Sequence, residues 1–227
     1  MKIEILGTRG EIPASAPRYR NHSGVLVDGK ILFDLGEAKF LRRKSKNIFI
    51  THLHPDHAVF VRNPMALSDV HVYAPEQSRS PFITIAKPVT IGACRVRPIP
   101  THHSSKVKSC AYLIESGQKR VLYTGDIVWM DKKYRSRLGR LDCVVTEASY
   151  VREGGLVRRD KTGRLYGHAG IPNIIRMFES HTNKFILTHF GSWFFKDVKG
   201  SHKRIAALGE KYGVKLIVAH DGMTFTM

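Results

Sequence analysis

Short apolar segments recur along the whole chain, and most of them are rich in β-branched or aromatic residues. Gly, Asp or Pro residues separate the segments, as they commonly do at the ends of strands. The pattern predicts strands over residues 2–6, 24–28, 31–34, 47–50, 71–75, 90–100, 110–115, 120–126, 143–148, 184–190 and 215–221.

Helical patterns are fewer, and they fall on residues 57–67, 170–181 and 202–213. A Pro inside the first segment limits its length, and a Pro near the start of the second suits a first helical turn. In the third, Ile205, Leu208 and Tyr212 follow helical spacing before a closing Gly. Many strands with a few interspersed helices indicate a layered α/β fold. Because no linker or internal repeat interrupts residues 1–227, we expect one domain.

The charge balance adds an expectation about partners. The chain carries 37 Lys and Arg against 19 Asp and Glu, a formal net charge of +18. Such a surplus favours a polyanionic partner, because each neutralised phosphate releases counterions. We therefore expect nucleic acid or another polyphosphate as a partner, and the alternative is a basic surface that is simply solvated.

The cysteines and the apolar runs bear on the compartment. The three cysteines are far apart and form no CxxC pair, which argues against a disulfide framework. The first residues lack the apolar core of a signal peptide, and no run approaches the roughly 18 apolar residues of a membrane span. We expect a cytoplasmic protein with no membrane contact, and the sequence leaves a homodimer open.

One short stretch points to a metal site. In "THLHPDHA", directly after the apolar run 47–50, four side chains with metal-binding groups fall within six positions: His52, His54, Asp56 and His57. In an extended loop, alternate side chains point to the same side, so His52 and His54 can converge on one ion while the other two face a second. Imidazole and carboxylate ligands suit Zn²⁺, Mn²⁺ or Fe. Packing or solubility would not place so many of these groups beside a strand end.

The spacing HxHxDH is where the chain resembles the metallo-β-lactamase fold hydrolases. The resemblance covers essentially the whole chain and is nearest to the branch with tRNase Z and related phosphodiesterases, whose opening is similar to "LGTRGEIPASAPRYRNHSGVLVDG". It implies a four-layer αββα sandwich, with two mixed sheets flanked by helices. It also implies two divalent metal ions, Zn or Mn, with Fe as a further option.

The resemblance extends to individual ligands and their supports. His103 fits the ligand of "IPTHHSS" better than His102, and the choice between them stays open. The implied metal ligands are His52, His54, Asp56, His57, His103, Asp126 and His189, with Asp126 as the bridge between the ions. The residues implied to support them from behind are Asp34, His220 and Asp221. Such a pair of ions would lower the pKa of a bound water, although a carboxylic or a phosphate ester could both be attacked.

A second stretch, "TEASY…GRLYGHAG", favours the phosphate ester over the carboxylic ester as the substrate. It looks like the phosphodiesterase branch's acidic turn and its following "GH" segment, in which an acidic residue orients a proton-donating His. Glu147 and His168 occupy those positions. We expect these two residues and Asp56 to be catalytic. The alternative for His168 is a cap on the helix that begins near Gly170.

The loop that leads to His168 is basic and rich in Gly. Its cations are Arg152, Arg158, Arg159, Lys161 and Arg164. At the mouth of a two-metal site they would attract a phosphate backbone, so they are candidate substrate-binding residues. The alternative is that they form a solvated face, as most runs of charge do.

Departures from the tRNase Z pattern shape the functional expectation. The chain between His57 and His103 is too short for the long arm that grips tRNA, and "HFGSW" replaces the expected "HxSSRY". We therefore expect a dinuclear metal-dependent phosphodiesterase acting on nucleic acid, RNA more than DNA. The alternatives are a phosphodiesterase for small cyclic or dinucleotide diesters, a lactonase or thioesterase on the same fold, and a nucleic-acid binder without activity.

Overall fold

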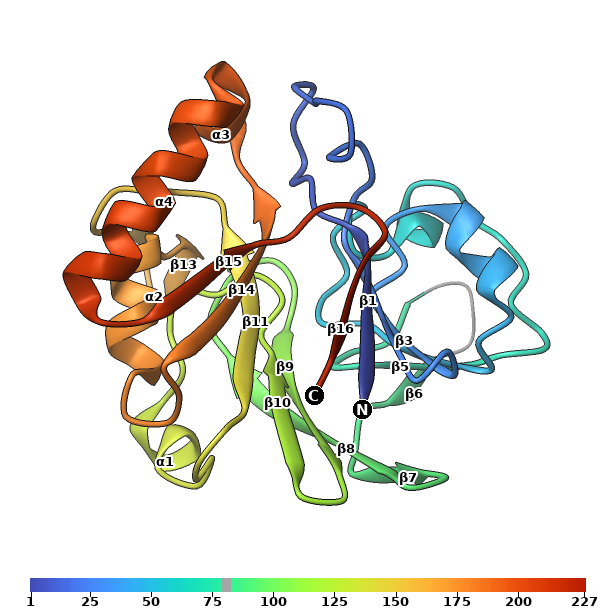
Figure 1. The fold of residues 1–227 in the computed structure, drawn as a ribbon. Helices are drawn as coiled ribbons and strands as arrows, with labels where there is room; N and C mark the ends of the chain where they lie inside the picture. Colours follow the sequence, from blue (N-terminus) through green and yellow to red (C-terminus); the bar gives the residue numbers. More distant parts are fainter. Residues whose placement is uncertain (79–82) are drawn as a thin grey trace.

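The computed structural model describes residues 1–78 and 83–227, and two seven-stranded sheets dominate it (Figure 1). The first sheet has the order β16-β1-β2-β3-β4-β5-β6. Its strands are β1 (Lys2–Gly7), β2 (Gly24–Val27), β3 (Ile31–Phe33), β4 (Asn47–Phe49), β5 (His71–Ala74), β6 (Ile83–Ile85) and β16 (Met223–Thr226).

The second sheet has the order β15-β14-β11-β10-β9-β8-β7, and a separate hairpin pairs β12 with β13. The strands of the second sheet are β7 (Val89–Ile91), β8 (Cys94–Thr101), β9 (Ser109–Ser116), β10 (Lys119–Tyr123), β11 (Cys143–Ala148), β14 (Lys184–Phe190) and β15 (Lys215–Val218). The hairpin strands are β12 (Leu156–Arg159) and β13 (Leu165–His168).

Both sheets are mixed in the same way. In the first, the pairs from β16 to β3 are antiparallel and those from β3 to β6 are parallel. In the second, the pairs from β7 to β10 are antiparallel and those from β10 to β15 are parallel. Antiparallel neighbours need only a tight turn, whereas parallel neighbours need a crossover. The crossovers therefore gather on the parallel halves.

The apolar side chains form layers around the sheets. One cluster fills the space between the sheets, with Phe33, Phe49 and Tyr112 among its fully buried residues. A second lies under α2 (Ile171–Phe178) and α4 (Val198–Tyr212), which cover the outer face of the second sheet (Figure 1). The third cluster, on the outer face of the first sheet, includes residues of the 3₁₀ helices η1 (Ala38–Arg43) and η2 (Val59–Val61). The expected α/β class with two mixed sheets is confirmed.

Several elements differ from the sequence prediction. The helix expected over 57–67 is wrong, since only the 3₁₀ turn η2 forms there, before Pro64. The helix expected over 202–213 begins earlier, at Val198, because Asp197 caps it by accepting a hydrogen bond from the Gly200 N–H. Strands β6, β12, β13 and β16 and the short helices α1 (Lys132–Arg135) and α3 (Ser192–Lys196) were not predicted. Among the described residues, no helix has the length and apolar composition to span a bilayer.

Candidate metal centre

The candidate ligands lie where strands of the two sheets end. The loop with His52 to His57 follows β4, and Asp126 follows β10. His103 follows β8, and His189 is the second-last residue of β14. These strands bring their carboxyl ends to one edge, which is where open α/β sheets place ligand sites. The sheet order therefore gathers side chains that are far apart in sequence.

The gathered side chains form two groups that could each hold a metal ion. In each group the candidate ligand atoms lie within 4.8 Å of one another. The first group is His52, His54 and His103, and the second is Asp56, His57, Asp126 and His189. His102 lies outside both, because its Nε2 is hydrogen-bonded to Asp131 at 3.1 Å. All seven expected ligands are thus brought together, with His103 in place and His102 turned away.

The Asp126 carboxylate lies between the two groups. Its Oδ2 is 3.8 Å from His52 Nε2 and 3.6 Å from His103 Nε2. Its Oδ1 is 3.3 Å from His57 Nε2 and 3.4 Å from His189 Nδ1. Each oxygen therefore faces the histidines of a different group, as a carboxylate shared by two ions would.

The unpaired atoms and the protonation of the site fit divalent cations. Within the described chain, His52 Nε2 and Asp126 Oδ1 are buried without a hydrogen-bond partner, a costly arrangement for polar atoms unless something else binds them. Burial lowers the pKa of His52 well below its usual value and that of His103 to about 4. Both imidazoles are therefore neutral, the form that binds metal.

Asp34 supports the centre from beneath. Its carboxylate accepts hydrogen bonds from His57 Nδ1 (2.7 Å), the Thr51 N–H (2.7 Å) and the Tyr123 hydroxyl (2.7 Å). The bond to Nδ1 leaves His57 Nε2 directed at Asp126. Asp34 has a φ of 58°, in the left-handed region that a non-glycine residue rarely adopts. The chain bends sharply here, directly after β3.

His168 approaches the centre from the β12–β13 hairpin. Its Nδ1 is hydrogen-bonded to Glu147 Oε2 at 2.8 Å and lies 3.8 Å from Asp126 Oδ2. The other Glu147 oxygen accepts a bond from the Ile127 N–H at 2.6 Å, which fixes the carboxylate. Burial alone would lower the pKa of His168, but the Glu147 carboxylate raises it to about 9. The expected Glu147–His168 pairing is thus seen directly.

The hairpin and the His103 segment after β8 are joined by one main-chain bond and one side-chain bond. The Gly167 N–H donates to the His103 carbonyl at 2.6 Å, and His103 Nδ1 is bonded to the Gly167 carbonyl at 2.8 Å. His103 and His168 consequently keep a fixed relation, with ring centroids 4.8 Å apart.

His220 and Asp221 do not contact the candidate ligands, contrary to expectation. Asp221 accepts hydrogen bonds from the Thr8 hydroxyl (2.8 Å) and from the Arg20 (2.8 Å) and Asn21 (2.9 Å) N–H groups. The His220 ring is bonded to the Asp221 carbonyl. Both residues secure the loop between β1 and β2, so their effect on the centre is indirect.

The basic candidates spread over the hairpin rather than converging. Arg158 and Arg159 are exposed neighbours on β12, so they point to opposite faces. Lys161 lies in the turn, and the Arg152 guanidinium stacks 5.8 Å from the Tyr150 ring. Arg164 lines a cavity of about 460 Å³. None of the five has an ion pair with a candidate ligand in the part of the chain that the structure describes.

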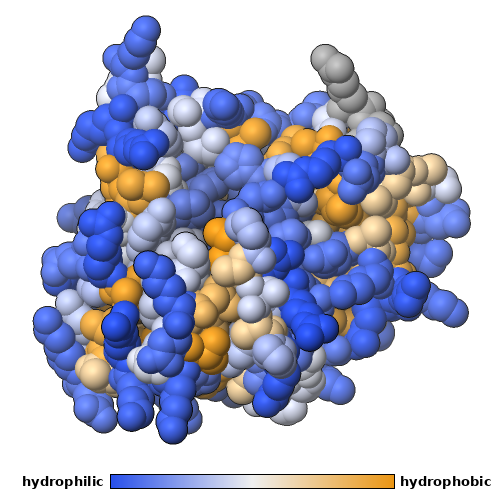
Figure 2. All heavy atoms as spheres, turned by 90° about the horizontal axis from the view of Figure 1, so that it is seen from above, coloured by the Kyte–Doolittle hydropathy of each residue, from blue (hydrophilic) through white to orange (hydrophobic). Residues whose placement is uncertain are grey.

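A hollow of about 280 Å³ opens over the centre. Several of its lining residues were not among the predicted site residues, and Ser149, Tyr150 and Trp193 are examples, although the first two directly follow the "TEA" motif. The Ser149 hydroxyl is hydrogen-bonded to His189 Nδ1 at 3.0 Å, and Trp193 Nε1 donates to the Ala148 carbonyl at 2.9 Å. The lining comes partly from the β1–β2 loop and α3, which lie at one end of the molecule (Figure 1). Seen from above, the surface is mostly hydrophilic, with separate small apolar patches (Figure 2).

Comparison with known proteins decides the family. The sequence profile described as the beta-lactamase superfamily domain matches residues 38–190, which is more than half of the chain. The chain belongs to the beta-lactamase superfamily. As a superfamily member with this histidine and aspartate cluster, it is a metal-dependent hydrolase.

Individual members of the superfamily are similar to it over different spans. Ribonuclease Z of Methanococcus aeolicus is 32% identical over 105 residues, a match that covers 38% of this chain and 32% of that protein. The metallo-beta-lactamase fold protein YhfI of Bacillus subtilis is 19% identical, with a TM-score of 0.71 over 99% of this chain and 98% of that one. The short form of human tRNase Z is 16% identical, with a TM-score of 0.62 over 100% and 99%. The two structural likenesses establish the superfamily fold.

Proposed function

We propose that this hydrolase is a dinuclear metal-dependent phosphodiesterase that cleaves nucleic acid, RNA in preference to DNA. The observation that carries the proposal is the Glu147–His168 pair at 2.8 Å, which lies outside the two ligand groups described above but forms a third possible metal-binding group with Asp126 and His189. In sequence the pair resembles the acidic residue and the proton-donating His of the phosphodiesterase branch, and this resemblance favours a phosphodiester over a carboxylic ester. An alkoxide that leaves phosphorus is a strong base and requires a proton.

The cluster would hold two divalent ions, Zn²⁺ or Mn²⁺, with Fe as a further option. Such ions supply a water of lowered pKa and neutralise charge on phosphate oxygens. Asp126 would be shared between them, since each of its oxygens faces one group of histidines. His57 is oriented by Asp34 and His103 by the Gly167 carbonyl, so both rings are held before any ion binds.

His168 would donate the proton to the departing oxygen. Because Glu147 occupies Nδ1, the nitrogen left for the substrate is Nε2. Glu147 is itself held by the Ile127 N–H, so the imidazole has a fixed direction. After donation, the Glu147 carboxylate orients the ring for the next proton. Each of these steps uses side chains that the fold already positions.

Two observations support nucleic acid as the substrate. The net charge of +18 favours a polyphosphate, and the partial relative from Methanococcus aeolicus is a ribonuclease Z. That relative is matched over only 32% of its length, so its whole activity is not carried over. Measuring RNA binding at several salt concentrations would test whether the substrate is a nucleic acid. The logarithm of RNA affinity should fall steeply with the logarithm of salt concentration.

The leaving group gives a sharp test of His168. In metal-loaded His168→Ala, cleavage of an RNA oligonucleotide should fall about 10²–10⁴-fold, the usual contribution of a positioned acid. Hydrolysis of methyl 4-nitrophenyl phosphate should fall much less, because 4-nitrophenolate leaves without protonation. Steady-state rates of both reactions, with metal content measured on the same samples, would check this.

The matched control is His71→Ala, which removes an exposed histidine of β5 outside the centre. It should leave both rates unchanged. The acid assignment is wrong if His168→Ala cleaves RNA at the wild-type rate. If RNA is not cleaved but small diesters are, the substrate class is a small cyclic or dinucleotide diester instead.

A further inference from the structure

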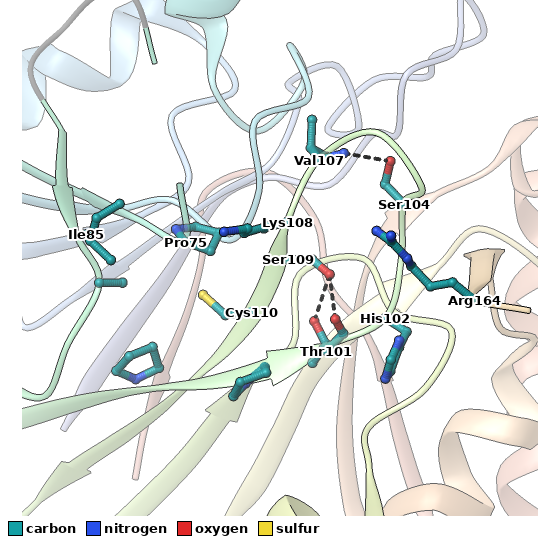
Figure 3. A pocket seen from close by; sticks show the side chains of 13 residues that line it. Pro75, Ile85, Thr101, His102, Ser104, Val107, Lys108, Ser109, Cys110 and Arg164 are labelled. Atoms are coloured by element: carbon teal, nitrogen blue, oxygen red, sulfur yellow. Dashed lines mark hydrogen bonds between the residues drawn. The ribbon is translucent and has the colours of Figure 1, made fainter. Parts of the chain in front are cut away.

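The described chain has a cavity that is larger than the hollow over the metal centre. It measures about 460 Å³ and lies where β6 and the end of β5 face β8 and β9 (Figure 3). Its lining shares no residue with the hollow over the centre. A volume of this size suits one small organic group.

The cavity and the metal centre nevertheless share walls. His102 lines the cavity and is followed directly by the candidate ligand His103. Ser109, on the same wall, pairs with the candidate ligand His52, and the next residue donates its N–H to the Thr51 carbonyl at 3.0 Å. Arg164 reaches the cavity from the hairpin that ends at His168 (Figure 3). The cavity therefore adjoins the centre at two places, at His102 beside His103 and at the bridge between Ser109 and His52.

One side of the cavity, its floor, is lined by apolar residues. Pro98 and Pro100 stand side by side on β8, Pro75 follows β5, and Ile85 ends β6. These side chains offer an apolar surface to a bound group. Ile85 is 47% exposed, so the floor is not fully covered by the rest of the described chain.

The rim of the cavity is cationic. Lys108 and Arg164 line it, and no Asp or Glu does so among the described residues. Glu76 is nearby, but it accepts a hydrogen bond from the Lys108 backbone N–H at 2.9 Å and leaves the ammonium group without an ion pair in the described chain. Arg164 has only a 3.6 Å contact with Asp160, through Nε. The neighbouring hydroxyls are occupied, since Ser104 accepts from the Val107 N–H and Ser109 donates to the Thr101 carbonyl (Figure 3).

We propose that this cavity binds the nucleotide next to the scissile phosphate, with its base on the proline floor and its outer phosphate at Lys108 and Arg164. The inference rests on the proposed phosphodiesterase function and adds a subsite to it. An apolar floor and a cationic rim match a nucleotide, which combines a planar heterocycle with an anion. The shared walls place such a nucleotide beside the metal centre.

Three esters with one leaving group test the proposal. They are methyl 4-nitrophenyl phosphate, uridine 5′-(4-nitrophenyl phosphate) and the same uridine ester with a 3′-phosphate. All release 4-nitrophenolate, so the reacting bond stays the same while first the nucleoside and then the outer phosphate are added. For the metal-loaded wild type we expect kcat/KM to rise about tenfold at each addition, mainly through KM.

The variants assign each gain to a part of the cavity. Lys108→Ala with Arg164→Ala should remove the gain from the 3′-phosphate and keep the gain from the nucleoside. Ala86→Phe, which narrows the cavity without changing charge, should remove the gain from the nucleoside. Lys106→Ala is the matched control, because this exposed lysine lies in the same loop as Lys108 but does not line the cavity.

The outcomes separate this proposal from the proposed function. Equal kcat/KM for the three esters in the wild type would overturn the subsite, although the enzyme would still be a phosphodiesterase. Gains that survive in the cavity variants would also overturn it, since the nucleotide must then bind elsewhere. No turnover of any ester would contradict the phosphodiesterase function itself.

Discussion

Two buried aspartates of the centre show how partners separate a structural carboxylate from a ligand. Asp34 receives hydrogen bonds from Thr51, His57 and Tyr123, so its oxygens are satisfied by the protein. Asp126 is equally buried, yet its Oδ1 lacks a hydrogen-bond partner within the described residues and faces imidazole nitrogens at 3.3–3.4 Å. Only the arrangement around Asp126 would be stabilised by a bound cation.

This contrast predicts how the protein responds when Asp34 is removed. Asp34→Ala removes the acceptor of four buried donor groups, the Thr51 N–H and hydroxyl, His57 Nδ1 and the Tyr123 hydroxyl, and should lower the free energy of unfolding by about 3–5 kcal/mol. Tyr123→Phe removes one donor and keeps the carboxylate, so it should cost only about 1–2 kcal/mol. Urea unfolding of both variants in metal-free buffer would measure the difference. Equal losses would show that Asp34 does not organise these donors.

At the scale of elements, the β12–β13 hairpin connects the acid to the ligands. Gly167 has a φ of 110° and bonds to His103 through its N–H. A Cβ at this position would collide with the carbonyl oxygen of Leu156 on the partner strand. The hairpin can therefore place His168 over the centre only with glycine at position 167.

A pair of glycine variants tests that role. Gly167→Ala should distort the hairpin and reduce both metal content and RNA cleavage, the latter at least as strongly as His168→Ala, because His168 is displaced and His103 loses its bonds to Gly167. Gly163→Ala, at a φ of 81° in the hairpin turn with open space around it, should cost only about 1 kcal/mol of backbone strain and keep most activity. Activity and metal content of the two purified variants are the measurements. Full activity in Gly167→Ala would contradict the argument.

The elements also explain what the sequence could and could not predict. The strands and the ligand loop after β4 were predictable, because apolar alternation and the HxHxDH spacing are local signals. Strands β12 and β13 were not, since each has only four residues and the two pair only with each other in a hairpin. The convergence of His103, Asp126 and His189 depends on the sheet order, which composition does not encode. The resemblance supplied those residues, and the structure supplied their distances.

At the scale of the molecule, the metal centre lies apart from the apolar cores. The three hydrophobic clusters pack between and outside the sheets, and the candidate ligands stand at the strand ends. Loss of metal should therefore leave the fold intact. It should also leave the polar atoms of the candidate ligands without the ion that binds them.

Metal removal is predicted to lower stability without unfolding the chain. Chelation should abolish hydrolysis and lower the unfolding temperature, since an ion present at about a thousand times its Kd contributes about 4 kcal/mol. Near-ultraviolet circular dichroism of the chelated protein should remain native-like, and Zn²⁺ or Mn²⁺ should restore both activity and the unfolding temperature. An unfolded chelated protein would contradict the separation of centre and core.

The pairing of β1 with β16 has a consequence for the order of events during synthesis. The partners Lys2 and Thr226 belong to the first and the last strands of the structure, and β16 forms the edge of the first sheet. Asp221, just before β16, anchors Thr8 across 213 positions of sequence. On the ribosome, β1 therefore presents an open edge until the last strand emerges. Only then can Asp221 secure the β1–β2 loop, which forms part of the rim over the centre. All candidate metal ligands are therefore synthesised before the rim of the site can form.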